Sequence, residues 1–88
     1  MAGYSLRIKP SAAREVDDIG STSDRRRVVD RIERLAEDPR PRACVKLARE
    51  GYYRIRQGRY RIIYEIRDAE LVVLVVRVGD RRDVYRGI

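Results

Sequence analysis

Arginine side chains are concentrated in one short segment of this 88-residue chain, and they are the groups best placed to do chemistry. Residues 51–64 contain no Asp or Glu, but they contain four arginines: Arg54, Arg56, Arg59 and Arg61. A guanidinium group is always charged, and its flat fork of N–H donors matches the geometry of a phosphate. The segment therefore predicts a binding site for a polyanion, with nucleic acid as the first candidate.

The residues around these arginines predict a β-hairpin. Apolar and polar residues alternate over Tyr52–Arg56 and over Arg59–Arg67, and Gln57-Gly58 between them is typical of a two-residue turn. Because side chains alternate across a sheet, one face of this hairpin is apolar and belongs to the core. That face carries Tyr53, Ile55, Tyr60, Ile62, Tyr64 and Ile66.

The four arginines share the other face. In the register that this turn implies, Arg56 faces Arg59 and Arg54 faces Arg61. Like charges opposite each other destabilise a sheet, so such a cluster indicates a site more often than an accident. A one-residue bulge would move some of the arginines to the other face. The alternative is that the side chains extend into water or pair with acids such as Glu37, Asp38 or Glu65.

Cationic residues continue beyond the last apolar run, as Arg77, Arg81, Arg82 and Arg86. If the strand expected over Leu71–Val78 pairs beside the return strand of the hairpin, Arg81 and Tyr85 reach the rim of the same basic face. A phenol among guanidinium groups ionises more easily than a free one, because nearby positive charge favours phenolate. The alternative, which the spacing alone favours, is that Tyr85 is a partly buried anchor for the tail.

The composition excludes several other kinds of chemistry. The chain has no histidine and one cysteine, Cys44, which rules out an intrachain disulfide, a zinc site of Cys and His ligands, and an imidazole base. We therefore expect neither a metal nor a cofactor. Lys and Arg outnumber Asp and Glu by 21 to 14, and this net charge of +7 fits a polyanionic partner and a well-solvated surface equally well.

No segment predicts a signal peptide or a membrane span. Residues 1–10 lack an apolar core of signal-peptide length, and the longest apolar run, Leu71–Val76, is far too short to cross a bilayer. We therefore expect a cytoplasmic protein with no membrane partner.

The start of the chain predicts a strand followed by a helix. Tyr4–Ile8 alternates as a strand does. Apolar residues then recur at helical spacing, with Ser11 placed to cap the helix and Gly20 to end it. The apolar positions of this helix are Ala12, Ala13, Val16 and Ile19.

A second helix and a central strand complete the predicted fold. Residues 21–24 offer caps for the helix, and Pro39 and Pro41 terminate it. Leu71–Val78 is apolar at nearly every position, which predicts an interior strand buried on both faces. The chain is expected to be a single α+β domain over residues 1–88, with a helical hairpin on one sheet face. The stripe of the second helix is Val28, Val29, Ile32, Leu35 and Ala36.

Taken together in this order, these pieces resemble the RelE/ParE superfamily of bacterial and archaeal toxins, the effectors of type II toxin–antitoxin systems. The resemblance covers essentially the whole chain and implies a β-α-α-β-β-β order with a four-stranded, mainly antiparallel sheet. The matching pieces are Asp38-Pro39, Lys46-Leu47, Tyr53–Arg56, Gly58–Tyr64, Asp68 with Leu71–Val78, and Val78–Arg86.

The resemblance also implies a set of site residues. RelE-like members are endoribonucleases that cut mRNA in the ribosomal A site, whereas ParE-like members lack the catalytic set and poison gyrase. The positions that match the RelE-like set are Arg54, Arg56, Arg61, Arg81 and Tyr85. The best-known members have lysines where this chain has Arg54 and Arg56, and an arginine cannot act as a base.

The implied reaction is attack of a ribose 2′-hydroxyl on the adjacent phosphate, and it needs no metal. Without histidine, Tyr85 is the best available base; Arg61 and Arg54 hold the phosphate oxygens, and Arg81 stabilises or protonates the leaving oxygen. Because arginine is a poor acid, we expect slow cleavage of free RNA, with the ribosome orienting the mRNA. The residues expected to bind RNA around this centre are Arg56, Arg59, Arg77 and Arg82.

Three alternatives remain at this point: a gyrase-directed toxin, a nucleic-acid-binding module, and an inactive relic that binds only an antitoxin. The resemblance implies a cognate antitoxin from an adjacent gene and a toxin–antitoxin hetero-oligomer. A domain of charge +7 favours an acidic, partly disordered chain that folds as it binds. The expected partners are therefore this antitoxin, the ribosome and mRNA.

Overall fold

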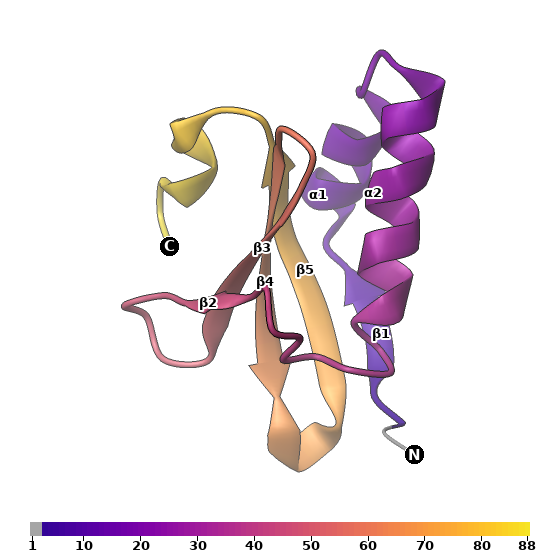
Figure 1. Cartoon of the computed structure of the whole chain (residues 1–88). Helices are drawn as coiled ribbons and strands as arrows, with labels where there is room; N and C mark the ends of the chain where they lie inside the picture. The colour runs from indigo at the N-terminus through magenta and orange to yellow at the C-terminus, as the bar shows by residue number, and fades with distance from the viewer. Residues whose placement is uncertain (1–2) are drawn as a thin grey trace.

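A computed structural model describes residues 3–88, which form one mixed five-stranded sheet in the order β1-β5-β4-β3-β2 (Figure 1). The strands are β1 (Ser5–Ile8), β2 (Val45–Lys46), β3 (Tyr52–Gln57), β4 (Tyr60–Arg67) and β5 (Val72–Gly79). β1 runs parallel to β5, and all other neighbours are antiparallel. The α+β class is confirmed, and the expected four strands are joined by a fifth, β2.

The extra strand was missed because two residues are too few to show a period-2 pattern. β2 exists because Val45 and Lys46 pair with Arg54 and Tyr53 on the outer edge of β3. It extends the hairpin and leaves the rest of the predicted order unchanged.

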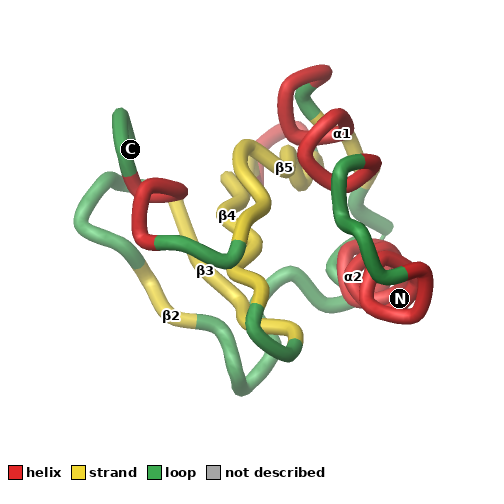
Figure 2. The backbone as a smooth tube through the Cα atoms, turned by 90° about the horizontal axis from the view of Figure 1, so that it is seen from above, coloured by secondary structure: helices red, strands yellow, loops and turns green. Residues whose placement is uncertain are grey.

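Two helices cover one face of the sheet, as Figure 2 shows from above. The first, α1 (Pro10–Asp17), begins one residue before the predicted cap Ser11, with Lys9 at the N-cap position. Proline is favoured at the first helical position, because its fixed φ suits the helix and its missing N–H has no intrahelical partner to lose. The helix also ends at Asp17, ahead of Gly20.

The second helix, α2 (Thr22–Arg34), starts where the capping residues predicted. The Ser21 hydroxyl accepts a hydrogen bond from the Asp24 backbone N–H at 3.2 Å, which satisfies one of the free donors of the first turn. Within residues 3–88, neither helix is long and apolar enough to cross a bilayer.

The main core lies between the helices and the sheet, and it contains the predicted apolar face of the hairpin. Ile55, Ile62 and Tyr64 are fully buried there, and Tyr53 packs at its edge. β5 is an interior strand buried on both faces, as its composition predicted. The helices contribute Ala12, Val16, Ile19, Val28, Ile32 and Leu35.

A second, smaller core lies on the opposite face of the sheet. It forms because the tail, residues 80–88, folds back as a short 3₁₀ turn over Arg82–Tyr85, seen in yellow at the C-terminus in Figure 1. Val84 is buried in it to 1% exposure. The sequence predicted a short polar tail, because one valine and one tyrosine among nine residues show no periodicity. The cluster consists of Tyr52, Ile63, Val76 and Val84.

An exposed ionic network joins the segment before β1 and the segment after α2 to the turn between β4 and β5. Arg40 donates to both carboxylate oxygens of Asp68, at 2.8 and 3.1 Å, and the Tyr4 hydroxyl donates to the same carboxylate at 2.7 Å. Arg40 also donates to the Tyr53 hydroxyl at 3.2 Å. The hydrogen bonds from Arg40 and Tyr4 lower the pKa of Asp68 to about 2.

We predict that Asp68→Asn destabilises the protein at neutral pH, because the variant loses the charged partner of Arg40. A carboxylate whose pKa is depressed in the folded state stabilises that state above the unfolded pKa, which is about 3.9 for Asp. The difference between wild type and variant should therefore shrink as pH falls from about 4 toward 2. Urea titrations at several pH values measure it, with Glu70→Gln in the same turn as the control. A difference that persists unchanged at pH 2 would contradict the prediction.

Candidate anion-binding site

The turn of the hairpin that carries the arginines lies one residue later in the chain than predicted. Gln57 pairs with Tyr60, so the two-residue turn is Gly58-Arg59 rather than Gln57-Gly58. Gly58 has φ +60°, in the left-handed region that glycine adopts without strain. This register also places Tyr53 opposite Tyr64, where their rings stack with centroids 5.9 Å apart.

The shift changes which arginines meet but keeps them on the same face. Arg56 lies opposite Arg61, as a directly facing pair of like charges, and Arg54 lies opposite the buried Ile63. Arg59 leaves the sheet for the turn, where its guanidinium is 3.7 Å from Asp80 and lies over the Tyr60 ring. The predicted cluster of four is thus a cluster of three, which we call the arginine face: Arg54, Arg56 and Arg61.

The arginine face meets the tail through two long hydrogen bonds. Arg54 Nη1 donates to the Tyr85 hydroxyl at 3.3 Å, and Arg61 Nη1 donates to the Asp80 carbonyl at 3.3 Å. Tyr85 therefore reaches the rim of the basic face, as its sequence position predicted. It is also the half-buried tail anchor of the alternative interpretation, since it packs against the second core.

Two donors on this face lack any protein partner. The Nε atoms of Arg54 and Arg61 are buried and make no hydrogen bond within residues 3–88. Neither guanidinium forms an ion pair with a described carboxylate. A buried donor without an acceptor destabilises the fold, and a facing pair of like charges destabilises it further. An anion bound here relieves both effects.

Arg77 is held in a different way. A register shift in the β4–β5 pairing brings Arg77 opposite Ile63, and its Nε donates to the Glu15 carboxylate of α1 at 3.2 Å. The same carboxylate accepts from the Val78 backbone N–H at 2.9 Å, because β1 ends at Ile8 and leaves that edge of β5 unpaired. Nothing in the sequence linked Glu15 to this strand. A role of Arg77 in RNA binding stays a prediction.

Arg81 and Arg82 are exposed at the start of the tail turn, directly after Asp80, whose carbonyl accepts from Arg61, and neither forms an ion pair within residues 3–88. Their predicted contributions to catalysis and RNA binding stay predictions. No cluster of His, Cys, Asp or Glu in residues 3–88 has the composition of a metal site.

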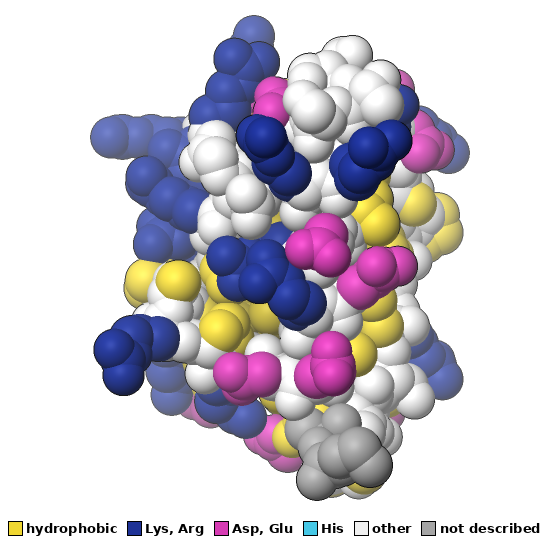
Figure 3. Space-filling view, turned by 45° about the vertical axis from the view of Figure 1, so that its right-hand side comes forward, with side chains coloured by type: hydrophobic (Ala, Val, Ile, Leu, Met, Phe, Trp, Pro, Cys, Tyr) yellow, Lys and Arg dark blue, Asp and Glu magenta, His cyan; other side chains and the backbone are white. Residues whose placement is uncertain are grey.

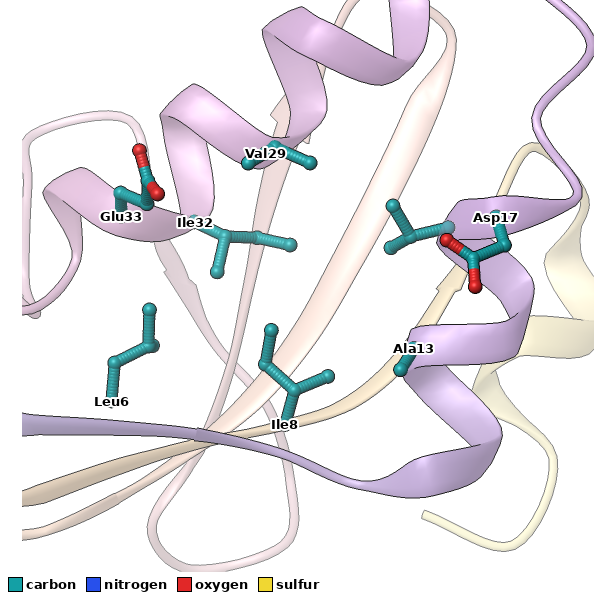
Figure 4. A pocket seen from close by; sticks show the side chains of 8 residues that line it. Leu6, Ile8, Ala13, Asp17, Val29, Ile32 and Glu33 are labelled. Carbon is teal, nitrogen blue, oxygen red and sulfur yellow. The ribbon is translucent and has the colours of Figure 1, made fainter.

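A separate apolar groove opens on the helical side of the molecule, between α1, α2 and the edge strand β1 (Figure 4). Its volume is about 220 Å³, and Ile8 and Val29 on its rim are 40% and 38% exposed. Figure 3 shows this helical side as a mixture of basic, acidic and apolar patches. The groove is lined by Leu6, Ile8, Ala13, Val16, Asp17, Val29, Ile32 and Glu33.

The fold, with a helical hairpin on one face of an antiparallel-dominated sheet, is that of RelE toxins of known structure. The chain is 27% identical to a double arginine-to-alanine mutant of Escherichia coli RelE in the free state, with TM-score 0.80, covering 97% of this chain and 92% of that one. The chain is 31% identical to the same mutant in complex with a peptide of the antitoxin RelB. The TM-score is 0.75, and the match covers 93% of this chain and 86% of that one.

A RelE–RelB complex of Pyrococcus horikoshii shares the fold at 24% identity, with TM-score 0.80, covering 91% and 98%. No curated protein matched the sequence. The family model of the ParE toxin of type II toxin–antitoxin systems (parDE) matches residues 6–85. The chain therefore belongs to this toxin family, within the RelE/ParE superfamily that the sequence resembled.

We predict that Arg56→Gln stabilises the protein at low ionic strength by about 0.2–1 kcal/mol, because it removes one of two directly facing like charges. Urea unfolding measures the gain, which should shrink as salt or inorganic phosphate is added. Arg42→Gln is the control, since Arg42 is exposed in a loop before β2. Equal effects of the two substitutions would show that the facing pair carries no strain.

Proposed function

We propose that this toxin is a ribosome-dependent endoribonuclease that cuts mRNA in the ribosomal A site and so inhibits translation. The observation that carries the proposal is the arginine face, on which Arg54 and Arg61 have Nε donors without a partner in residues 3–88 and Arg54 donates through Nη1 to the Tyr85 hydroxyl. This arrangement brings hydrogen-bond donors for a phosphate close to a tyrosine oxygen that can act as a base. The overall likeness to RelE structures over more than nine-tenths of the chain supports it.

The reaction divides into roles for four side chains. Arg61 and Arg54 hold the non-bridging phosphate oxygens and stabilise the charge that develops on them. Tyr85 acts as the general base and takes the proton of the ribose 2′-hydroxyl as the 2′-oxygen bonds to phosphorus. The bond from phosphorus to the 5′-oxygen breaks, and Arg81 stabilises or protonates that oxygen. The products are a 2′,3′-cyclic phosphate and a 5′-hydroxyl.

The remaining arginines bind the RNA backbone rather than the reacting atoms. Arg56 is exposed beside Arg61 and docks a neighbouring phosphate. Arg59 and Arg82 extend the basic surface at the turn and at the tail, and Arg77 contributes from β5. Because arginine is a poor acid, free RNA should be cut slowly, and the ribosome raises the rate by orienting the mRNA. The scheme assigns every role to a side chain and requires no metal ion.

A gyrase-directed toxin is the second candidate, and the match to the ParE family model favours it. ParE-like members share this fold without the catalytic set. Programmed ribosomes and a supercoiling assay with purified gyrase, run on the same preparation, separate the two candidates. Inhibition of supercoiling without any mRNA cleavage would decide for gyrase.

We predict that Arg61→Ala and Tyr85→Phe each reduce mRNA cleavage by about a hundredfold or more, the usual effect of removing a charge-stabilising donor or a general base. The measurement is primer extension on ribosomes programmed with a defined mRNA. Arg42→Ala and Tyr4→Phe are matched controls away from the arginine face. If Tyr85→Phe cleaves at the wild-type rate, Tyr85 is not the base.

RNA binding through the arginine face should depend steeply on salt. Three phosphate contacts predict a slope of log K against log salt of about −2 for single strands, because each contact releases counterions. Affinity for a short single-stranded RNA should then fall about twentyfold between 50 and 200 mM salt. Fluorescence anisotropy measures this fall, and a flat response would contradict phosphate binding at this face.

The proposed partner that restrains the toxin is an acidic, partly disordered antitoxin in a hetero-oligomer, as in the RelE complexes with RelB. Its apolar segment would lie in the groove between α1 and α2, where Ile8 and Val29 are exposed. Its carboxylates would mask the arginine face or draw the tail away from it. Because apolar burial resists salt, this complex should persist at salt concentrations that release RNA.

Co-purification of the toxin with the product of the adjacent reading frame tests this partner. Adding the antitoxin to programmed ribosomes should suppress cleavage, and Val29→Glu should weaken the complex because it places a charge in the apolar groove. A complex that forms and still cleaves mRNA at the full rate would exclude neutralisation at the arginine face.

A further inference from the structure

We propose that Gly79 and Val84 form a seat that positions the catalytic tyrosine. The seat holds the tail on the sheet, so that the Tyr85 hydroxyl lies beside Arg54. The role of the seat in catalysis rests on the proposed ribonuclease function. The seat itself rests only on the packing of the tail.

Gly79 is required by space rather than by backbone conformation. It is the last residue of β5 and pairs with Arg61 of β4, so its backbone is fixed by the sheet. A Cβ atom at this position would lie 2.6 Å from Cγ1 of Val84, which is closer than nonbonded carbons approach. Its φ is outside the left-handed region, unlike that of Gly58.

Val84 cannot move aside to admit that Cβ. Its branched side chain has a restricted χ1, and it is buried to 1% exposure against Tyr52, Ile63 and Val76. A side chain at position 79 must therefore displace the tail turn as a whole.

The polar contacts of the tail are too weak to set its position without this packing. Three arginines donate to it: Arg54 to the Tyr85 hydroxyl and Arg61 to the Asp80 carbonyl, both at 3.3 Å, and Arg77 to the Arg86 carbonyl at 3.4 Å. All three distances exceed the usual N–H···O separation of about 2.9–3.0 Å. The ion pair between Arg59 and the Asp80 carboxylate is longer still, at 3.7 Å, and it is exposed to solvent. Val84 directly precedes Tyr85 in the chain, so the burial of Val84 determines where the phenol lies. Val84 and Gly79 are positioning residues rather than catalytic ones.

The test compares Gly79→Ala, Val84→Ala and the double variant with the wild type, and Gly20→Ala is the matched control. A Cβ at Gly20 meets no atom within 4 Å. Short pulses of trypsin, followed by intact-mass analysis, report how often the bonds after Arg81 and Arg82 become accessible. Circular dichroism verifies that each variant is folded.

Gly79→Ala should raise the rate of tail cleavage by trypsin about tenfold or more, the effect of overpacking a well-filled contact on an opening equilibrium. The double variant should be cleaved more slowly than Gly79→Ala, because truncating Val84 makes room for the new methyl group. If Gly79→Ala is cleaved as slowly as the wild type, or the double variant is cleaved as fast as Gly79→Ala, the proposed contact between Gly79 and Val84 does not hold the tail. Should Gly79→Ala fail to fold, Val84→Ala alone must expose the same bonds.

Cleavage of mRNA on programmed ribosomes supplies the second readout. Gly79→Ala should lower kcat by a larger factor than it raises KM, because the arginine face on the hairpin remains in place while the phenol moves away. The double variant should recover part of kcat. An unchanged kcat in a variant whose tail is exposed overturns the positioning role. A wild type that never cleaves mRNA overturns the ribonuclease proposal, and the trypsin result then decides the seat by itself.

Discussion

The structure depends on covering the β4–β5 pair on both faces. Ile62 of β4 is buried under the helices, and its neighbour Ile63 is buried under the tail. An 88-residue chain has two helices for one face and only nine residues for the other. The second face is therefore covered in part, and the uncovered part carries the arginine face. Because a small domain buries a limited fraction of its surface, this face of the sheet has an open charged part beside the apolar cluster under the tail.

This arrangement connects stability with the proposed chemistry. Arg56 and Arg61 face each other across the hairpin, and the buried Nε atoms of Arg54 and Arg61 have no acceptor among residues 3–88. These features weaken the isolated fold, and a bound phosphate would compensate for them. The apolar packing of Val84 next to the same arginines keeps the tail close without neutralising their charge, because a side chain with no carboxylate does the holding.

Some other charged groups of the fold are balanced by partners from distant segments. Glu15 of α1 takes the place of a strand partner for Val78 and pairs with Arg77, and Asp68 joins Arg40 to Tyr4. These contacts attach the helices and the connecting turns to the sheet. By contrast, no guanidinium group of the arginine face forms an ion pair with a carboxylate of residues 3–88.

The sequence alone determined two helices, four of the five strands and the faces that they bury. The alternation over residues 52–67 assigned the buried face of the hairpin correctly, and the continuous apolar run of β5 showed that it is interior, because period and polarity are local properties. The tertiary structure alone decided the turn at Gly58-Arg59, the pairing of β2, the contact of Glu15 with Arg77, and the tail seat at Gly79 and Val84. Glu15 and Arg77 are distant in the chain and meet only in the folded protein. The turn, the β2 pairing and the tail contact join nearer residues, but strand register and packing decide them, and the periodicity of the sequence does not encode either.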